Sequence, residues 1–257
     1  MIYQTTIDHI VYHFPSLKVL LAKASPHRSA DVLAKIAAEN EIERAAAQIT
    51  LSNVPLTQFL EEPLIPYEED EVTRLILDTH DKKNFSLISH FTVGDLRDWL
   101  LSEQANAKIL DKIKNALTPE MVSAVSKIMR IQDLITVAKK CRNVTKFRST
   151  MGLKNRISTR LQPNHPTDDL KGVLVSILDG LLLGSGDAVI GINPAFDSPQ
   201  KTKELLLMLD DLIQKYKIPT QSCVLTHVTT LLELMNSGFK QVDLVFQSIA
   251  GSEKANQ

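Results

Sequence analysis

A repeat in the carboxyl-terminal part of the chain most constrains its fold: short β-type runs alternate there with amphipathic helical segments. The runs begin at residues 157, 188, 220 and 244, so successive starts differ by 31, 32 and 24 residues. That spacing is typical of a repeated strand–helix unit. Strands joined through a helix pair in parallel, because a parallel connection needs a dozen or more residues. The repeat therefore predicts a parallel sheet covered by helices.

The helical segments between the runs carry the apolar face that such a sheet requires. Val173 and Ile177 recur at helical spacing in the first segment. Ser198 predicts the cap of the second segment and Pro199 its first turn. Gly238 stands where a left-handed residue would end the third. Sheets of this kind are either open and doubly wound or closed into an eight-stranded barrel, and both bind ligands at the carboxyl ends of their strands.

The residues up to about Arg142 are typical of a helical region. Thr92 followed by Asp95 predicts a capping box, and Thr118 predicts a further cap. The stretch "SADVLAKIAAENEIERAAAQITL" predicts helical structure capped by Ser29, with Val32, Leu33 and Ile36 at helical spacing among alanines. The opening "IYQTTIDHIVYHF" alternates instead in the manner of a β-hairpin.

Composition and charge argue against several classes of function. The chain has 29 basic and 30 acidic residues and a net charge of -1, so its composition does not indicate the broad positive surface that nucleic acid binders use. No stretch reaches the roughly 20 uninterrupted apolar residues of a membrane helix. Two distant cysteines, Cys141 and Cys223, and the lack of a secretory leader pattern predict a reduced, cytoplasmic compartment. A dinucleotide-binding loop is disfavoured, because Gly184 and Gly186 precede a strand rather than follow one.

Polar side chains recur at the carboxyl ends of three of the predicted strands. Arg160 and Gln162 lie two apart and so share one face; Asn193 ends the second run, and Gln247 and Ser248 lie near the end of the fourth. A guanidinium donates to hydroxyl or carboxylate oxygens, and carboxamide oxygens accept from an ammonium group. Such a set suits a small amino alcohol or amino acid. Polar strand ends also form turns, so the pattern alone leaves both interpretations open.

Three histidines have simpler interpretations than a chemical role. His9 and His13, four residues apart, would lie on one face of a helix as metal ligands do, but no third ligand accompanies them and a structural role is favoured. His227 opens a predicted helix and is interpreted as a packing or capping residue. No metal site is predicted.

Several separate stretches resemble one enzyme family. The segments "RLQPN", "GDAVIGINP", "IPTQSCVLTHVTT" and "FQSIAGSEK" are similar to the large subunit of ethanolamine ammonia-lyase. The segments "RSADVLAKIAAE", "YEEDEVTRLILD" and "LRDWLLSE" resemble the helical amino-terminal region of the same family. The resemblance implies an α/β fold, with a mainly helical domain over residues 1–150 and the first half, about four strands, of a TIM (β/α)8 barrel over residues 151–257.

The resemblance also implies a carbon–nitrogen lyase that uses adenosylcobalamin to convert ethanolamine to acetaldehyde and ammonia by radical chemistry. The residues implied to bind the substrate are Arg160, Leu161, Gln162 and Asn193. The residues implied to face the cobalamin are Pro194, Gln247 and Ser248. Arg160 is also the implied catalytic residue, as a fixed donor to the substrate hydroxyl. The remaining task of the protein would be to position the substrate and exclude water.

The partners implied are a small subunit and further copies of the large subunit. A complete barrel takes about 250 residues, whereas the repeat begins near Ile157 and the sequence stops at Gln257. We therefore expect a piece of a longer subunit that is inactive alone. Two alternatives stay open: a catalytically inactive scaffold subunit of the same oligomer, and another TIM-barrel lyase acting on a small polar substrate. The expected location is the cytoplasm, either free or inside a bacterial microcompartment.

Overall fold

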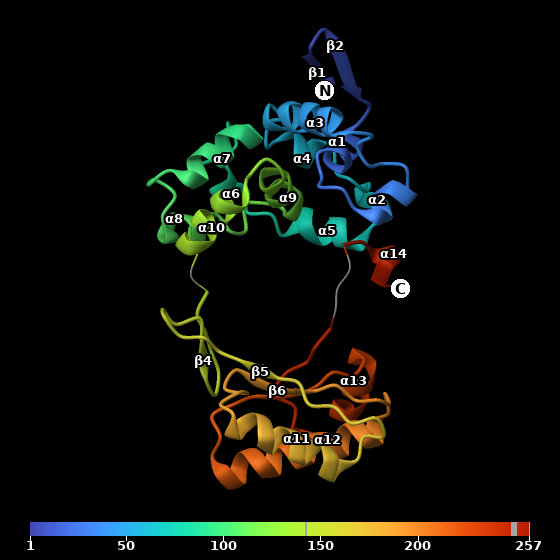
Figure 1. Cartoon of the computed structure of the whole chain (residues 1–257), viewed down its shortest axis with the longest axis vertical. Helices are drawn as coiled ribbons and strands as arrows, with labels where there is room; N and C mark the ends of the chain where they lie inside the picture. Colours follow the sequence, from blue (N-terminus) through green and yellow to red (C-terminus); the bar gives the residue numbers. More distant parts are fainter. Residues whose placement is uncertain (142, 248–250, 257) are drawn as a thin grey trace. The chain divides into compact units, whose positions relative to one another are not determined.

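The chain divides into two compact units (Figure 1). The structure is a computed structural model that describes residues 1–141, 143–247 and 251–256. The amino-terminal unit comprises Met1–Arg142 together with Ala250–Gln257, and the sheet unit comprises Asn143–Ile249. The predicted domain boundary between residues 150 and 151 stays a prediction.

The amino-terminal unit is mainly helical and carries one antiparallel hairpin. The hairpin joins β1 (Tyr3–Ile7) to β2 (Ile10–Phe14), which confirms the predicted hairpin. His9 lies between the two strands and His13 within β2, so the two histidines do not share a helix. The helices are α1 (Leu17–Lys23), α2 (Ser29–Leu33), α3 (Glu41–Ser52), α4 (Gln58–Glu61), the 3-10 helix η1 (Tyr67–Glu69), α5 (Glu71–Asp78), α6 (Lys82–Phe85), α7 (Val93–Leu101), α8 (Ala107–Ile113), α9 (Pro119–Lys127), α10 (Ile131–Lys140) and α14 (Glu253–Asn256).

One apolar core holds this unit together. Buried side chains from the hairpin and from helices α1, α3, α7 and α9 meet in it, among them Phe14, Leu20, Leu51, Leu96 and Met121. Burial of large apolar side chains is the main stabilising contribution to a fold of this size. The hairpin is part of this core rather than an appendage, because Tyr3 and Phe14 are buried as well.

Two of the predicted helix starts in this unit are confirmed. Thr92 caps α7 by accepting a hydrogen bond from the Asp95 amide at 3.1 Å, and the Asp95 carboxylate accepts from the Thr92 amide at 2.9 Å. This is the reciprocal capping box that the spacing indicates. Thr118 caps α9 by accepting from the Met121 amide at 3.3 Å.

The predicted helix after Ser29 differs from the structure. Ser29 is the first residue of α2 and Arg28 occupies the cap position. The helix then stops early, because Lys35 takes a left-handed conformation with φ of 58°. Asn40 starts the separate helix α3 by accepting from the Glu43 amide at 2.9 Å. The apolar residues of α2 do not reach the core, and Leu33 is 84% exposed.

The sheet unit contains the predicted parallel sheet. Its elements are β3 (Thr145–Lys146), β4 (Thr150–Met151), β5 (Arg160–Leu161), α11 (Leu170–Leu182), β6 (Val189–Ile192), α12 (Pro199–Tyr216), β7 (Ser222–Val224) and α13 (Val228–Asn236). Strands β5, β6 and β7 pair in parallel in that order, with Leu161 beside Ile190 and Gly191 beside Cys223. The first three predicted runs therefore form strands.

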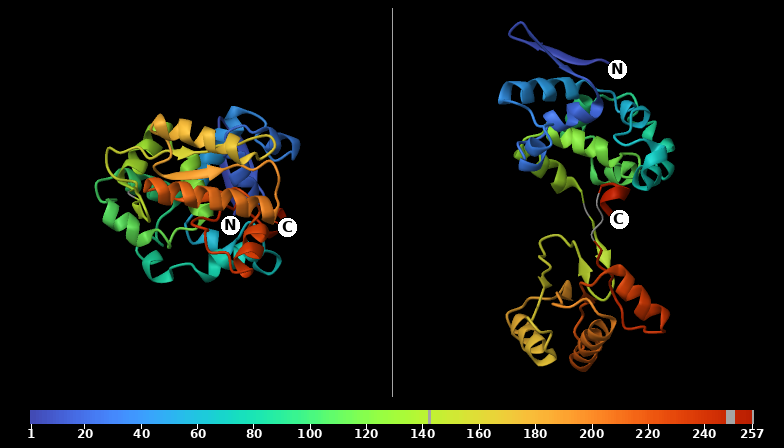
Figure 2. Two further views of the ribbon diagram at one scale, coloured as in Figure 1. Left: turned by 90° about the horizontal axis from the view of Figure 1, so that it is seen from below. Right: turned by 90° about the vertical axis from the view of Figure 1, so that its right-hand side faces the viewer.

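Helices α11 and α12 lie side by side on one side of this sheet, as Figures 1 and 2 show. Val173 and Ile177 of α11 are fully buried against Ile190 and Ile192 of β6 and Val224 of β7. Alternation along a strand turns the intervening residues to the opposite face of the sheet. We call that opposite face, which carries Arg160, Gly191 and Cys223, the open face.

The predicted helix ends of the sheet unit are also confirmed. Ser198 caps α12 by accepting from the Lys201 amide at 3.2 Å, and Pro199 is the first helical residue. Gly238 follows α13 with φ of 90°, and its amide donates to the Met235 carbonyl at 3.0 Å. A left-handed residue at this position is a common end of a helix, and glycine adopts it without strain.

The fourth predicted run, from residue 244, does not form a strand over its described residues, 244–247. Asp243 supplies a physical reason, because its carboxylate accepts from the Ser222 amide at 2.9 Å and from the Ser222 hydroxyl at 3.0 Å. A side chain thus satisfies an amide of β7 that a further strand would otherwise pair. Across the described residues no closed barrel is seen, so the fold is a mixed α/β fold and the TIM half-barrel stays a prediction.

Candidate functional site

The open face of the sheet is crossed by the side chain of Arg160. This arginine lies at the start of β5 and is exposed. Its guanidinium carbon stands 5.2 Å from the centre of the Phe246 ring, within the range of a cation–π contact. A β-carbon at position 191 would lie only 2.9 Å from Nη2 of Arg160, so the guanidinium rests close to the backbone of β6.

Cys223 also lies on the open face, where the charge of Arg160 affects the pKa of its thiol. The thiol is 4% exposed and is a free cysteine. Burial raises the pKa of Cys223, and the positive charge of Arg160 acts in the opposite direction. Because Gly191 pairs with Cys223 across β6 and β7, the arginine side chain points from β5 across the sheet toward β7.

The two predicted carboxamides leave neighbouring strands at their carboxyl ends. Gln162 follows β5 directly and Asn193 follows β6, and both side chains are exposed. The Asn193 amide donates to the Pro163 carbonyl at 3.0 Å, which ties the two strand ends together. Unlike these two exposed side chains, the Leu161 side chain packs against the apolar core beneath the sheet.

The remaining predicted residues lie in loops or outside the described chain. Pro194 follows Asn193 and is half-buried, and Gln247 is exposed one residue after Phe246. Ser248 lies outside the described residues. His227 caps α13, with Nδ1 as acceptor for the Thr229 amide, which confirms its interpretation as a capping residue.

A buried carboxylate holds the loop that carries Asn193 and Pro194. Asp168 is 0% exposed and accepts from the amides of Ala195 at 2.8 Å and Phe196 at 3.0 Å. Asp168 belongs to the loop between β5 and α11, so it links the loop after β5 to the loop after β6. Hydrogen bonds from backbone amides to a charged acceptor are stronger than hydrogen bonds between two neutral groups.

A second carboxylate repeats this arrangement one loop further on. Asp197, in the loop after β6, accepts from the hydroxyl of Thr226, from the hydroxyl of Thr230 at 2.8 Å and from the amide of His227 at 3.1 Å. Asp168 and Asp197 each stand one residue before the cap of the helix that follows. Together they join three consecutive loops at the carboxyl ends of the strands.

The Thr226 hydroxyl is the main cause that lowers the pKa of Asp197, followed by the Thr230 hydroxyl and the His227 amide, while desolvation raises it. Because this pKa is lower in the folded chain, Asp197 stabilises the fold above its unfolded pKa of about 3.9, and the contribution is lost as pH falls through the folded value. Asp197→Asn is therefore expected to reduce stability at neutral pH and to converge with the wild type in strong acid. Urea unfolding midpoints measured against pH test this.

Asp211→Asn, which changes an exposed carboxylate on α12, is the matched control for that measurement. It is expected to leave the pH dependence as it is in the wild type. A constant difference between Asp197→Asn and the wild type at every pH would contradict the assigned role of the charge.

The amino ends of the strands are closed by a different set of bonds. Gln221 is 0% exposed, and its carboxamide oxygen accepts from the amides of Arg148 at 3.1 Å and Ser149 at 3.0 Å. Its amide nitrogen donates to the Ala188 carbonyl and to the Ser149 hydroxyl. Arg148 and Ser149 lie between β3 and β4, so this hairpin covers the amino ends of β6 and β7.

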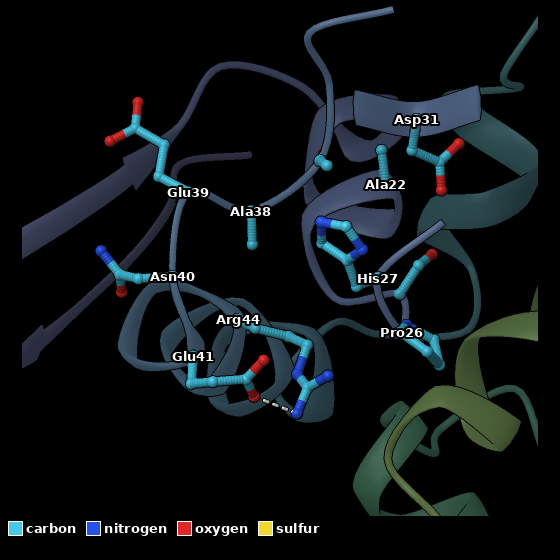
Figure 3. Close-up of a pocket in the computed structure, with 11 residues that line it drawn as sticks. Ala22, Pro26, His27, Asp31, Ala38, Glu39, Asn40, Glu41 and Arg44 are labelled. Carbon is cyan, nitrogen blue, oxygen red and sulfur yellow. Dashed lines mark ion pairs between the residues drawn. The ribbon is translucent and has the colours of Figure 1, made fainter. Parts of the chain in front are cut away.

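A separate pocket of about 260 Å³ lies within the amino-terminal unit (Figure 3). His27, Asp31 and Arg44 are among the residues that line it, and Arg44 forms an ion pair with Glu41 there. No predicted site residue lines this pocket. Among the described residues, no group of three or more histidine, cysteine or acidic side chains is arranged to hold a metal ion.

Sequence reasoning did not single out Gly191, Phe246, Asp168 or Asp197. A signal exists for Gly191, since a lone glycine inside a strand indicates a close approach of another group. Asp168 and Asp197 share a local signal as well, because each immediately precedes a helix cap at a strand–helix junction. Phe246 offers no such signal, because its role depends on a contact with a residue far away in sequence.

These features define an α/β protein with parallel strand–helix units and a guanidinium on the open face of its sheet. The family model "Ethanolamine ammonia lyase large subunit (EutB)" matches residues 12–257. The large subunits of ethanolamine ammonia-lyase from Escherichia coli (strain K12) and from Salmonella typhimurium (strain LT2) are each 41% identical to the chain over 251 residues. The chain belongs to the ethanolamine ammonia-lyase large subunit family. The matches cover 98% of the chain and 55% of each relative, so the chain spans about half the length of these relatives.

Proposed function

We propose that the chain acts within the large subunit of an ethanolamine ammonia-lyase and contributes the open face of its sheet to the binding of ethanolamine. Family membership supports the class of reaction, removal of ammonia from a small amino alcohol. The observation that carries the proposal is the exposed guanidinium of Arg160, held beside β6 on the face opposite the helices. Neighbouring strand ends carry two exposed carboxamides.

The chemistry of these side chains matches the two functional groups of ethanolamine. The Arg160 guanidinium donates to the hydroxyl oxygen and stabilises negative charge that develops there. The carboxamide oxygens of Gln162 and Asn193 accept from the ammonium group. Leu161, whose side chain packs into the core, would contact the substrate through its backbone.

The loop residues proposed for the cofactor fit its periphery in chemical character. Adenosylcobalamin, when bound, supplies the radical chemistry that this class of reaction requires. Gln247 offers a carboxamide that both donates and accepts, which suits the amide groups around a corrin ring. Pro194 offers a half-buried apolar surface in the loop after β6. Ser248 remains a third proposed contact.

The proposed partners are a small subunit, consistent with the name of the related large subunits, and further copies of the large subunit. The proposed location is the cytoplasm, free or in a bacterial microcompartment. Over the described residues, the structure contains no helix that is both long and apolar enough to span a membrane.

The proposal is tested by assembling the natural enzyme that contains this chain with its small subunit and adenosylcobalamin. On addition of ethanolamine we expect acetaldehyde and ammonia in equal amounts, together with a change in the visible spectrum of the cobalamin. The matched control omits ethanolamine. Cobalamin binding without turnover would support the scaffold alternative. Turnover of another small polar substrate, with none of ethanolamine, would support a different lyase.

A further inference from the structure

The Arg160 side chain occupies space beside Gly191 that the side chain of any other residue at position 191 would fill. At position 191, a β-carbon would stand 2.9 Å from Nη2, 3.0 Å from Nε and 3.2 Å from Cζ of Arg160. Gly191 lies inside β6, in extended backbone that any residue adopts. The missing side chain therefore serves the neighbouring guanidinium and not the local backbone conformation.

A second contact reaches the same guanidinium from another part of the chain. The Phe246 ring centre lies 5.2 Å from Cζ of Arg160, although the ring itself is 43% exposed. A cation held over an aromatic face is attracted to the ring, so this contact restrains the guanidinium.

We propose that Gly191 and Phe246 are positioning residues that set the direction of the Arg160 guanidinium across the open face. Gly191 gives it room to lie against β6, and Phe246 restrains it there. The consequence for catalysis rests on the proposed role of Arg160 in ethanolamine binding. The placement of the guanidinium does not, since it follows from the contacts alone.

Gly191→Ala separates positioning from folding. The new methyl group would lie less than 3.0 Å from the Arg160 guanidinium, so one of these two groups has to move. The guanidinium is the far end of a flexible side chain and moves more easily than the strand. The strand therefore keeps its place and the guanidinium is displaced. Displacement of a binding group by about 1 Å costs roughly 10²-fold in rate, so we expect a loss of about that size in kcat/KM for ethanolamine in the assembled enzyme. Gly251→Ala, where a β-carbon meets nothing within 4 Å, is the matched control and is expected to be silent.

The loss should disappear when Arg160 is already absent. In an Arg160→Ala background, Gly191→Ala is expected to have no further effect on kcat/KM, because contacting residues are energetically coupled. Phe246→Leu should reduce kcat/KM and Phe246→Tyr should restore it, because the tyrosine ring keeps the aromatic face. Equal losses from Gly191→Ala with and without Arg160 would overturn the proposal.

A measurement independent of catalysis distinguishes this inference from the proposed function. In the purified full chain, the NMR signal of the Arg160 Nε–H group, assigned by its loss in Arg160→Lys, is expected to carry an upfield ring-current shift from Phe246. Phe246→Leu should abolish that shift and Gly191→Ala should change it. An unchanged signal in both variants overturns the positioning roles. A changed signal combined with full turnover by Arg160→Ala supports positioning and refutes the proposed role in ethanolamine binding.

Discussion

Arg160→Ala is expected to lower kcat/KM for ethanolamine by about 10²- to 10³-fold in the assembled enzyme, the usual effect of removing one preorganised donor from developing charge. Arg160 is exposed on the open face and contributes no side chain to the apolar core beneath the sheet. The variant should therefore fold like the wild type, and steady-state kinetics together with far-UV circular dichroism would measure both effects.

Two variants sharpen the interpretation of that result. Arg160→Lys keeps the positive charge but loses the planar fork of donors, so it should recover only part of the lost activity. Arg156→Ala removes an exposed arginine from the segment just before β5 and is the matched control for a general loss of charge. Wild-type kinetics in Arg160→Ala would remove Arg160 from the proposed site.

Asp168→Ala is expected to lower the free energy of unfolding by about 3 kcal/mol, since it leaves two backbone amides without their charged acceptor. The affected amides belong to Ala195 and Phe196, and Asp168 itself is fully buried. Alanine is also disfavoured at this position, where φ is 51°, whereas asparagine tolerates such a conformation. Asp168→Asn, which keeps one acceptor oxygen, should therefore cost less than Asp168→Ala.

Urea unfolding of the purified chain measures this loss, and hydrogen exchange locates it. Exchange should accelerate at the amides of residues 195 and 196, in the loop that carries Asn193 and Pro194. Asp169→Asn is the control at the adjacent position, because asparagine caps a helix about as well as aspartate does. Unchanged exchange in Asp168→Ala would show that the carboxylate does not hold this loop.

The strand–helix repeat predicts only part of what the structure shows for the sheet. Three of the four runs form strands, and each of these strands is followed by a helix whose apolar face covers one side of the sheet. The fourth run has strand-like residues as well, yet its described residues, 244–247, do not form a strand. The Asp243 carboxylate accepts a hydrogen bond from the Ser222 amide at the edge of β7. No local pattern within the run predicts that bond.

The candidate site divides in the same way. The placement of Arg160, Gln162 and Asn193 on neighbouring strands could be predicted, because hydrogen-bonding groups recur along corresponding runs and alternation within a strand indicates a shared face. Their role in a site stays a prediction. The partners that hold them could not be predicted. Gly191 matters only because the register of β5 on β6 brings it under a guanidinium, and Asp168 matters only because it accepts from amides 27 and 28 residues away.

The amino-acid sequence by itself determined the helix caps at Thr92, Thr118 and Ser198, the helix end at Gly238, the hairpin and three parallel strands. Capping, turn chemistry and hydrophobic periodicity act over a few neighbouring residues and can be recognised locally. Only the tertiary structure decided which carboxylates join the loops, which residues flank Arg160 and where pairing ends beyond β7. Those contacts depend on strand register and on packing between distant segments. The role of each residue therefore depends on which distant residues it contacts in the folded chain.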